Sequence, residues 1–242
     1  MRIVAIVQAR MGSTRLPGKV LLDLAGETVL ARVVNRLRRS RLCAEIVIAT
    51  TEDPRDDVIE QECRRLSVKC FRGSELDVLD RYHRTAGEAR AEAVVRITSD
   101  CPLIDPEVVD DTIQVFLNEH AEYASNVNPR RFPRGLDTEV FTAAALDRAW
   151  AEARETYQRE HVTPYLSEHP ELFRFSALVA EHDYSEHRWT LDTPEDFQLL
   201  REIYSSFRNV ATFGWRDVLA LVERRPELRD LNSNIMQKSL HS

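Results

Sequence analysis

Residues 3–19 read IVAIVQARMGSTRLPGK, an apolar run that leads directly into a loop of glycines, hydroxyls and cations. The run at 3–7 has the continuous apolar character of a strand buried on both faces of a parallel sheet. The cations of the loop are Arg10, Arg15 and Lys19. Such a loop can turn several backbone N–H groups and three positive side chains toward one anion. We expect that anion to be a triphosphate.

The loop matches neither of two common phosphate-binding motifs. Gly12 and Gly18 are six positions apart and Val20 follows Lys19, so the G-x-x-x-x-G-K-[ST] spacing is absent, as is the dinucleotide pattern G-x-G-x-x-G. Only three of the 33 basic residues are lysine. A lysine at the end of this loop is a compact charge on a flexible stem, suited to following a phosphate group.

Bulk properties restrict the class of protein. We expect one domain over residues 1–225, with a small acceptor or dimerisation element around 123–180, and a tail or docking arm at 226–242. The net charge of −7 argues against general nucleic-acid binding, and no apolar run reaches the roughly 20 residues that span a bilayer. The four cysteines have no zinc spacing, and with no signal peptide we expect reduced thiols in the cytoplasm.

The first half of the chain alternates strands and helices. We predict strands at 3–8, 45–50, 68–72 and 93–98, with helices at about 28–40, 54–67 and 76–90 between them. This order predicts an α/β, Rossmann-like three-layer sandwich around a mostly parallel sheet. Ligands bind such sheets beyond the carboxyl ends of the strands. The loop after the first strand and Asp100 after the fourth therefore fall on one edge.

Beyond residue 120 the pattern is less regular. Helices are expected at about 142–154, 157–167, 195–206 and 214–224, and a strand at 173–179. Three helix starts are marked by a capping side chain before a proline, at Asp53, Asp105 and Thr193.

Asp100 and Asp192 are the candidate metal ligands. Asp100 ends an apolar strand, and Asp192 follows the short run at 189–191. Magnesium usually takes one or two carboxylates together with phosphate oxygens, which suits two aspartates beside a cationic loop. The alternatives are a turn-forming aspartate before proline for Asp100 and a helix cap for Asp192.

Five stretches in order resemble the cytidylyltransferases that activate acidic sugars, the CMP-KDO and CMP-sialate synthetases, and within them the spore coat polysaccharide biosynthesis protein F branch. The resemblance runs to about residue 224. The stretches are ARMGSTRLPGK at 9–19, RGSELDVLDR at 72–81, RITSDCP at 96–102, EHVTPY at 160–165 and RWTLDTPED at 188–196.

The resemblance implies a fold of the nucleotide-diphospho-sugar transferase type and a Mg²⁺-dependent nucleotidyltransferase, commonly a homodimer. The enzyme would join a nucleoside monophosphate from CTP, or another nucleoside triphosphate, to a sugar or sugar acid for surface polysaccharide biosynthesis, releasing pyrophosphate. By analogy Asp100 and Asp192 would bind magnesium. The nucleotide contacts would come from Ala9, Arg10, Gly12, Ser13, Thr14, Arg15 and Lys19.

The base is left open by one departure from the family. KDO-type enzymes carry a glutamine two positions before the first metal aspartate, where it helps to read the base, and here that position is Thr98. CTP is favoured, but another nucleotide is possible. Arg72 and Ser74, after the third strand, are further candidates for base or ribose contacts.

In the reaction we expect, a sugar oxygen attacks the α-phosphate in line while Lys19, Arg15 and Asp100 provide the catalytic charges. The acceptor would be anionic and lie near residues 126–139. Candidates for contacting it are Arg130, Arg134, Asp137, Glu139 and His161. A solvated basic loop is the alternative for the arginines, and a histidine bonded to backbone in the core is the alternative that we favour for His161.

Two other functions compete with this one. A glycosyltransferase of the same fold would usually carry a D-x-D motif, whereas here Asp100 is followed by Cys101 and Pro102. A non-catalytic sugar-nucleotide-binding protein would have no need to combine Lys19 with two metal-binding aspartates.

Overall fold

In the computed structural model, residues 1–237 are described, and over that range seven strands form one sheet in the order β3-β2-β1-β4-β6-β5-β7. The strands are β1 Ile3–Gln8, β2 Glu45–Thr51, β3 Lys69–Gly73, β4 Ala93–Thr98, β5 Tyr123–Ser125, β6 Glu139–Thr142 and β7 Phe175–Ala177. The first four strands are parallel to one another, and β6 joins antiparallel to β4. The sheet is therefore mostly parallel, as the sequence predicts.

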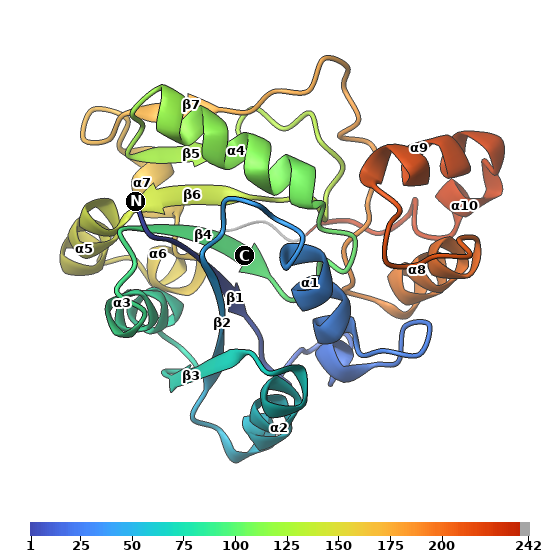
Figure 1. Cartoon of the computed structure of the whole chain (residues 1–242), viewed down its shortest axis with the longest axis horizontal. Coiled ribbons are helices and arrows are strands. Elements are labelled where there is room, and N and C mark those ends of the chain that lie inside the picture. Colours follow the sequence, from blue (N-terminus) through green and yellow to red (C-terminus); the bar gives the residue numbers. More distant parts are fainter. Residues whose placement is uncertain (238–242) are drawn as a thin grey trace.

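Helices cover both faces of the sheet (Figure 1). They are α1 Val29–Leu37, α2 Asp57–Leu66, α3 Val78–Glu88, α4 Pro106–Asn118, α5 Ala143–Glu152, α6 Thr156–His161, α7 Pro164–Glu168, α8 Pro194–Ser205, α9 Trp215–Arg224 and α10 Glu227–Asp230, with short 3₁₀ turns η1 Lys19–Leu21 and η2 Pro54–Asp56. Side chains of β1 alternate between the two layers: Val7 packs with α1, α2 and α4, and Ile6 packs with α3, α5 and α7. Because both faces of β1 are buried, its residues 3–7 are all apolar, as expected for a central strand.

The site edge lies where the strand order reverses. From β1 the chain proceeds outward through β2 and β3, then returns to add β4 on the other side of β1. The loops after β1 and β4 diverge at this point, which is where open α/β sheets bind their ligands. Gln8 and Thr98 are paired in register at the ends of these two strands.

The three predicted caps are present, and one of them joins distant helices. Asp53, Asp105 and Thr193 each accept a hydrogen bond from the backbone in the first turn of η2, α4 and α8. Asp105 also accepts a hydrogen bond of 2.7 Å from the backbone N–H of Trp215, which starts α9. This contact attaches the C-terminal helices to the sheet domain.

The structure adds detail to three of the expected segments. The helix predicted at 157–167 is two helices, because Val162 has a φ of +73° and Pro164 begins a new first turn. The segment 123–180 extends the central sheet through β6, β5 and β7. The predicted tail at 226–242 begins with α10, where Leu228 is buried, while residues 238–242 lie outside the described part of the chain.

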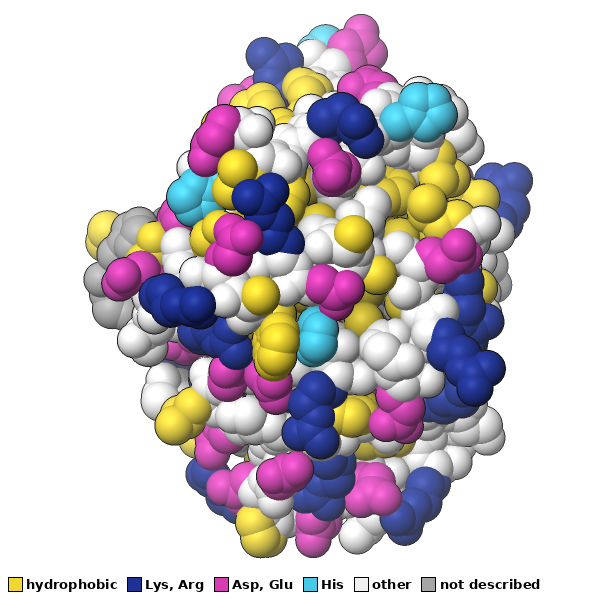
Figure 2. Space-filling view, turned by 90° about the vertical axis from the view of Figure 1, so that its left-hand side faces the viewer, with side chains coloured by type: hydrophobic (Ala, Val, Ile, Leu, Met, Phe, Trp, Pro, Cys, Tyr) yellow, Lys and Arg dark blue, Asp and Glu magenta, His cyan; other side chains and the backbone are white. Residues whose placement is uncertain are grey.

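No helix within residues 1–237 is long and apolar enough to cross a membrane. Figure 2 shows one face of the molecule, on which acidic and basic side chains are interspersed rather than separated into regions of one sign.

Candidate active site

A cavity of about 290 Å³ opens at the carboxyl ends of β1 and β4. Residues from the loop after β1, the start of α3, the loop after β4, the end of α6 and the segment before α8 line it. They are Gln8, Ala9, Arg10, Ser13, Thr14, Arg15, Lys19, Val20, Val78, Arg81, Thr98, Ser99, Asp100, Glu160, His161 and Asp192. The cavity therefore brings together the two aspartates and most of the loop that the sequence analysis singles out.

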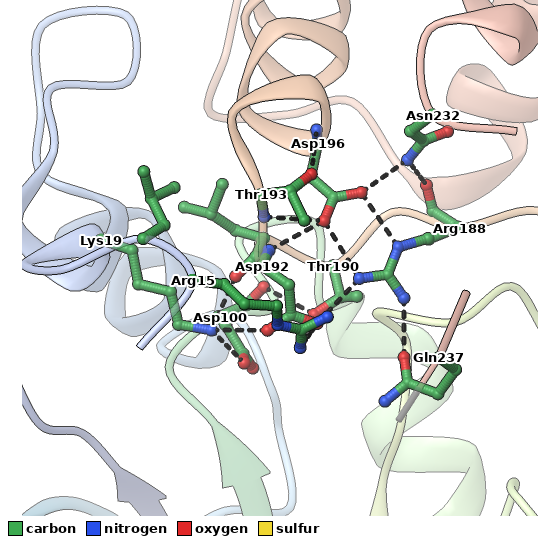
Figure 3. A network of polar contacts seen from close by, with 12 residues as sticks. Arg15, Lys19, Asp100, Arg188, Thr190, Asp192, Thr193, Asp196, Asn232 and Gln237 are labelled. Atoms are coloured by element: carbon green, nitrogen blue, oxygen red, sulfur yellow. Dashed lines mark hydrogen bonds and ion pairs between the residues drawn. The ribbon is translucent and has the colours of Figure 1, made fainter. Parts of the chain in front are cut away.

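Lys19 lies between the two candidate metal ligands (Figure 3). Its ammonium donates to Asp100 Oδ2 and Asp192 Oδ1, both at 2.8 Å, and to the backbone carbonyl of Leu191 at 2.7 Å. Gly18, with a φ of +70°, provides the left-handed turn immediately before it. All three ammonium donors are therefore used, and Lys19 holds the carboxylates close together.

Burial and charge oppose each other in this cluster. Burial by itself works to lower the pKa of Lys19, but Asp100 and Asp192 outweigh it and the pKa is raised. Burial likewise works to raise the pKa of Asp100, whereas the neighbouring ammonium holds it below its ordinary value. The cluster thus keeps Lys19 cationic and Asp100 ionised near neutral pH.

Asp192 is fixed by two arginines. Its Oδ2 lies 3.0 Å from Arg15 Nη2 and accepts a hydrogen bond of 2.8 Å from Arg188 Nη2. Arg188 also pairs with Asp196, a buried carboxylate that accepts the backbone N–H of Asp192 at 2.9 Å. Asn232 completes this network by donating to Asp196 at 2.8 Å. The side chain of Asp192 is oriented before any ligand arrives.

The backbone also holds Asp100 and Asp192 near each other. Leu191 N–H donates to the Asp100 carbonyl at 2.8 Å, and the Thr190 hydroxyl donates to the same oxygen at 3.1 Å.

A Cβ atom at Gly135 would lie 2.7 Å from the backbone carbonyl of Trp189, so only glycine permits this close approach of the loop at residues 130–135.

The carboxylates fit a magnesium ion better than a metal that needs a complete protein cage. Within residues 1–237 no group of three or more His, Cys, Asp or Glu side chains is arranged to hold a metal. Asp100 Oδ2 pairs with Lys19, whereas Asp100 Oδ1 accepts a long contact of 3.6 Å from the Cys101 thiol, which a cation could replace. Mg²⁺ typically uses one or two carboxylates and fills its remaining positions with water and phosphate oxygens.

The other residues of the loop after β1 line the cavity or lie next to it. Ala9, Arg10, Ser13 and Thr14 line it, and Arg10 Nη1 lies 3.9 Å from Glu75. Gly12 is beside the lining, where an added Cβ atom would lie 3.3 Å from the same carboxylate.

Two residues expected to contact the base lie outside the lining. Arg72 donates to the carbonyls of Thr51 and Asp53, each at 2.9 Å, and pairs with Asp57. Ser74 accepts the backbone N–H of Asp77 near the start of α3. Both therefore support the edge of the sheet, whereas Thr98 lines the cavity.

The candidates for binding the acceptor lie in four different settings. Arg130 and Asp137 form a two-bond pair at 2.6 and 2.7 Å, so they satisfy each other. Arg134 is half-buried, and its guanidinium makes no hydrogen bond or ion pair with any side chain or carbonyl in the described range.

The remaining two candidates lie apart from each other. Glu139 is buried in β6, where it pairs with Arg96 at 2.5 Å and accepts the Tyr123 hydroxyl at 2.6 Å. The structure assigns it to the core, not to the cavity wall. His161, at the end of α6, lines the cavity.

Sequence reasoning missed Gln8, Arg81, Arg188 and Glu160 as parts of the site. Each lies inside one of the motifs on which the resemblance rests or next to it, so the motif boundaries are the signal that could have found them. Arg188 was expected only as part of a motif and proves to orient Asp192.

The family model for cytidylyltransferase matches residues 4–221. Spore coat polysaccharide biosynthesis protein SpsF of Bacillus subtilis is 35% identical over 232 residues, covering 93% of this chain and 95% of that protein.

Two solved structures have the same architecture. A cytidylyltransferase from Leptospira borgpetersenii superposes with a TM-score of 0.92 at 35% identity, covering 99% of this chain and all of that one. A CMP:2-keto-3-deoxy-manno-octonic acid synthetase complexed with CTP has a TM-score of 0.66 at 20% identity, covering 85% of this chain and 99% of that one, and shares the fold. These similarities confirm the resemblance read from the motifs: the chain belongs to the cytidylyltransferase family.

Proposed function

We propose that this protein transfers a cytidylyl group from CTP to an anionic sugar acceptor, releasing pyrophosphate. The observation that carries the proposal is the convergence of Lys19, Asp100 and Asp192 at the edge of the cavity beside the loop 9–19. A transfer of this kind needs a site that holds a triphosphate and neutralises its charge, and it needs no covalent nucleophile on the protein.

Each part of the site has a task in this proposal. The loop residues Ala9, Gly12, Ser13 and Thr14 would approach the phosphates with backbone and hydroxyl groups. Arg10 and Arg15 would bind the β- and γ-phosphates, and they and Lys19 would balance the charge that develops on pyrophosphate. Thr98 would lie beside the base.

Asp100 and Asp192 would hold Mg²⁺, which when bound supplies positive charge to the phosphate oxygens and favours ionisation of a nearby hydroxyl. Asp100 Oδ1 would be the ligand from this residue, since Oδ2 pairs with Lys19, and Arg15 and Arg188 keep Asp192 in position. The cluster also fixes the separation of the two carboxylates, so that binding requires little reorganisation.

Arg134 is the favoured contact for the anionic group of the acceptor, since its guanidinium is free of protein partners over residues 1–237. A sugar carboxylate or phosphate could accept two hydrogen bonds from it. Arg130 and Asp137 would shape the loop around the acceptor. His161, which lines the cavity from the end of α6, would contact the acceptor or relay a proton.

The similarity to protein SpsF supports a role in surface polysaccharide biosynthesis. We also propose a homodimer, because members of the resembled family are commonly dimeric, and a cytoplasmic location. A glycosyltransferase remains the second candidate by fold, but the three cations of the loop suit a triphosphate better than the diphosphate of a finished sugar nucleotide.

A pyrophosphate-release screen tests the proposal. Four nucleoside triphosphates are each combined with Mg²⁺ and a panel of sugar acids and sugar 1-phosphates, and pyrophosphate is measured by a coupled assay. We expect release with CTP and at least one acidic sugar, and its loss in Asp100→Asn. Consumption of a sugar nucleotide without pyrophosphate release would favour the glycosyltransferase instead.

A further inference from the structure

Two buried polar atoms in residues that line the cavity have no hydrogen-bond partner within residues 1–237. They are Gln8 Oε1 and Arg81 Nε. Unpaired polar atoms of this kind are uncommon in folded proteins, and each needs a physical explanation. Here one atom is an acceptor, the other is a donor, and both belong to residues that line a single cavity.

The fold places these residues at the same edge by independent means. Gln8 is the last residue of β1, and its register partner on β4 is Thr98. Arg81 lies on α3, and the adjacent Tyr82 donates its hydroxyl to the carbonyls of Ile6 at 3.1 Å and Ile97 at 3.2 Å. Tyr82 thereby fixes α3 over the ends of both strands.

The guanidinium of Arg81 has little to neutralise it. Its side chain is buried, and over the described chain it forms no ion pair; its Nη1 donates to the carbonyl of Ser74. Burial disfavours the charged form and lowers the pKa of Arg81. A hydrogen-bond acceptor on a ligand would therefore stabilise the charged guanidinium if it bound at the edge formed by Nε and Nη2.

The residues around this pair suit the flat edge of a base. Val78, one turn before Arg81 on α3, gives an apolar wall, and the Thr98 hydroxyl is engaged at 3.2 Å with the thiol of Cys101. Lys19 and Asp192 reach the cavity from η1 and from the segment before α8, whereas Arg81 reaches it from the helix layer on the other sheet face. A nucleotide is divided in the same way, with charged phosphates at one end and a flat base at the other.

We propose that Gln8 and Arg81 read the Watson–Crick edge of cytosine. The guanidinium donates to O2 and N3, and the amide oxygen of Gln8 accepts from the exocyclic amino group. Uracil presents an N–H at position 3, which opposes the guanidinium donor, so the pair discriminates against UTP. This inference rests on the proposed function and adds to it the residues that select the base.

Binding measurements on two separate variants test the inference. Arg81→Lys keeps the positive charge but removes the planar fork, and Gln8→Leu removes the amide at similar size. Arg84→Lys, an exposed arginine one turn further along α3, is the matched control. Calorimetry with Mg²⁺ measures the dissociation constants of CTP, UTP and inorganic tripolyphosphate for each protein, and thermal unfolding verifies that each is folded.

We expect the wild type and Arg84→Lys to prefer CTP to UTP, and each test variant to lose about tenfold of that preference. Tripolyphosphate affinity should stay unchanged in all four proteins, because the phosphate end of the cavity is untouched. If Arg81→Lys does not fold, Gln8→Leu carries the test alone.

Two results would overturn the inference while leaving nucleotidyl transfer in place. One is a folded variant with an unaltered CTP-to-UTP ratio, and the other is a wild type that binds both nucleotides equally. A wild type that binds neither CTP nor tripolyphosphate would instead contradict the proposed function.

Discussion

Lys19 and Asp192 are 173 positions apart in the chain, yet Lys19 Nζ lies 2.8 Å from Asp192 Oδ1. The same ammonium lies 2.8 Å from Asp100 Oδ2, so one cation joins the loop after β1, the loop after β4 and the segment before α8. This contact defines the centre of the candidate active site.

Replacing Lys19 by methionine should abolish most turnover. The two carboxylates would lose the cation that holds them together, and the phosphates would lose a counter-charge. We expect the rate of pyrophosphate release to fall by about 100-fold or more. Lys19→Arg should recover little, since a planar guanidinium cannot satisfy three acceptors arranged around a point charge. Near-normal turnover in Lys19→Met would contradict this role.

Replacing Asp100 by asparagine should change the response to magnesium. The variant keeps the size of the side chain but removes the carboxylate whose Oδ1 would bind a cation. We expect turnover to fall about 100- to 1,000-fold and half-saturation to require more Mg²⁺. Titration of activity against Mg²⁺ checks this, and an unchanged titration curve would exclude Asp100 as a metal ligand.

Arg130 and Arg134 should behave differently although they are four residues apart. Arg134→Lys removes a free guanidinium, and we expect the KM for the acceptor to rise about tenfold with folding unaffected. Arg130→Lys breaks the two-bond pair with Asp137 and should mainly lower stability. Steady-state kinetics and chemical denaturation on both variants separate these effects. The reverse assignment would show that Arg130 is the residue that contacts the acceptor.

Glu139→Gln should destabilise the protein rather than weaken acceptor binding. Arg96 would be left as a buried guanidinium without its counter-charge, which typically costs about 3–5 kcal/mol. The free energy of unfolding in urea measures the effect, with Glu88→Gln, an exposed side chain at the end of α3, as the control. Normal stability together with a raised acceptor KM would return Glu139 to the substrate site.

Acidification should destabilise the fold through His187. Burial, together with the nearby Arg229, lowers the pKa of this ring below 6.5, and Arg229 lies 3.2 Å from its Nε2. The unfolded chain takes up a proton there at a higher pH than the native protein does. This contribution to stability is therefore present above pH 6.5 and is lost as the pH falls through the lowered native pKa.

Urea denaturation between pH 7.5 and pH 5 measures this dependence. In His187→Gln the decline should be smaller than in the wild type, whereas His182→Gln, which alters an exposed ring, should follow the wild type. Parallel curves for all three proteins would exclude His187 as a source of the acid sensitivity.

The sheet and its catalytic edge could be predicted because they depend on local patterns. The apolar run before residue 8 and the capped helix starts identify parallel strands and crossovers, and strand polarity then puts Asp100 beside the loop. The position of Asp192 could be inferred only through resemblance, since no local rule brings a segment near residue 190 back to β1.

Residues whose partners come from distant strands were harder to interpret. Glu139 lies opposite Arg96 only because β6 inserts antiparallel beside β4. The hydrophobic periodicity of the sequence does not reveal a strand order of this kind. Arg72 is expected from the sequence to contact the base or ribose, but its guanidinium donates to the carbonyls of Thr51, at the end of β2, and Asp53, just after it. Gln8 and Arg81 become informative only when it is known that Gln8 Oε1 and Arg81 Nε lack hydrogen-bond partners within residues 1–237.

A crystal structure with CTP and manganese in place of magnesium tests the central claim most directly. We expect an anomalous peak for the metal in contact with the carboxylates of Asp100 and Asp192, and the triphosphate lying along residues 9–19 with its α-phosphate nearest the metal. A triphosphate bound elsewhere, or a metal in contact with neither carboxylate, would contradict the account.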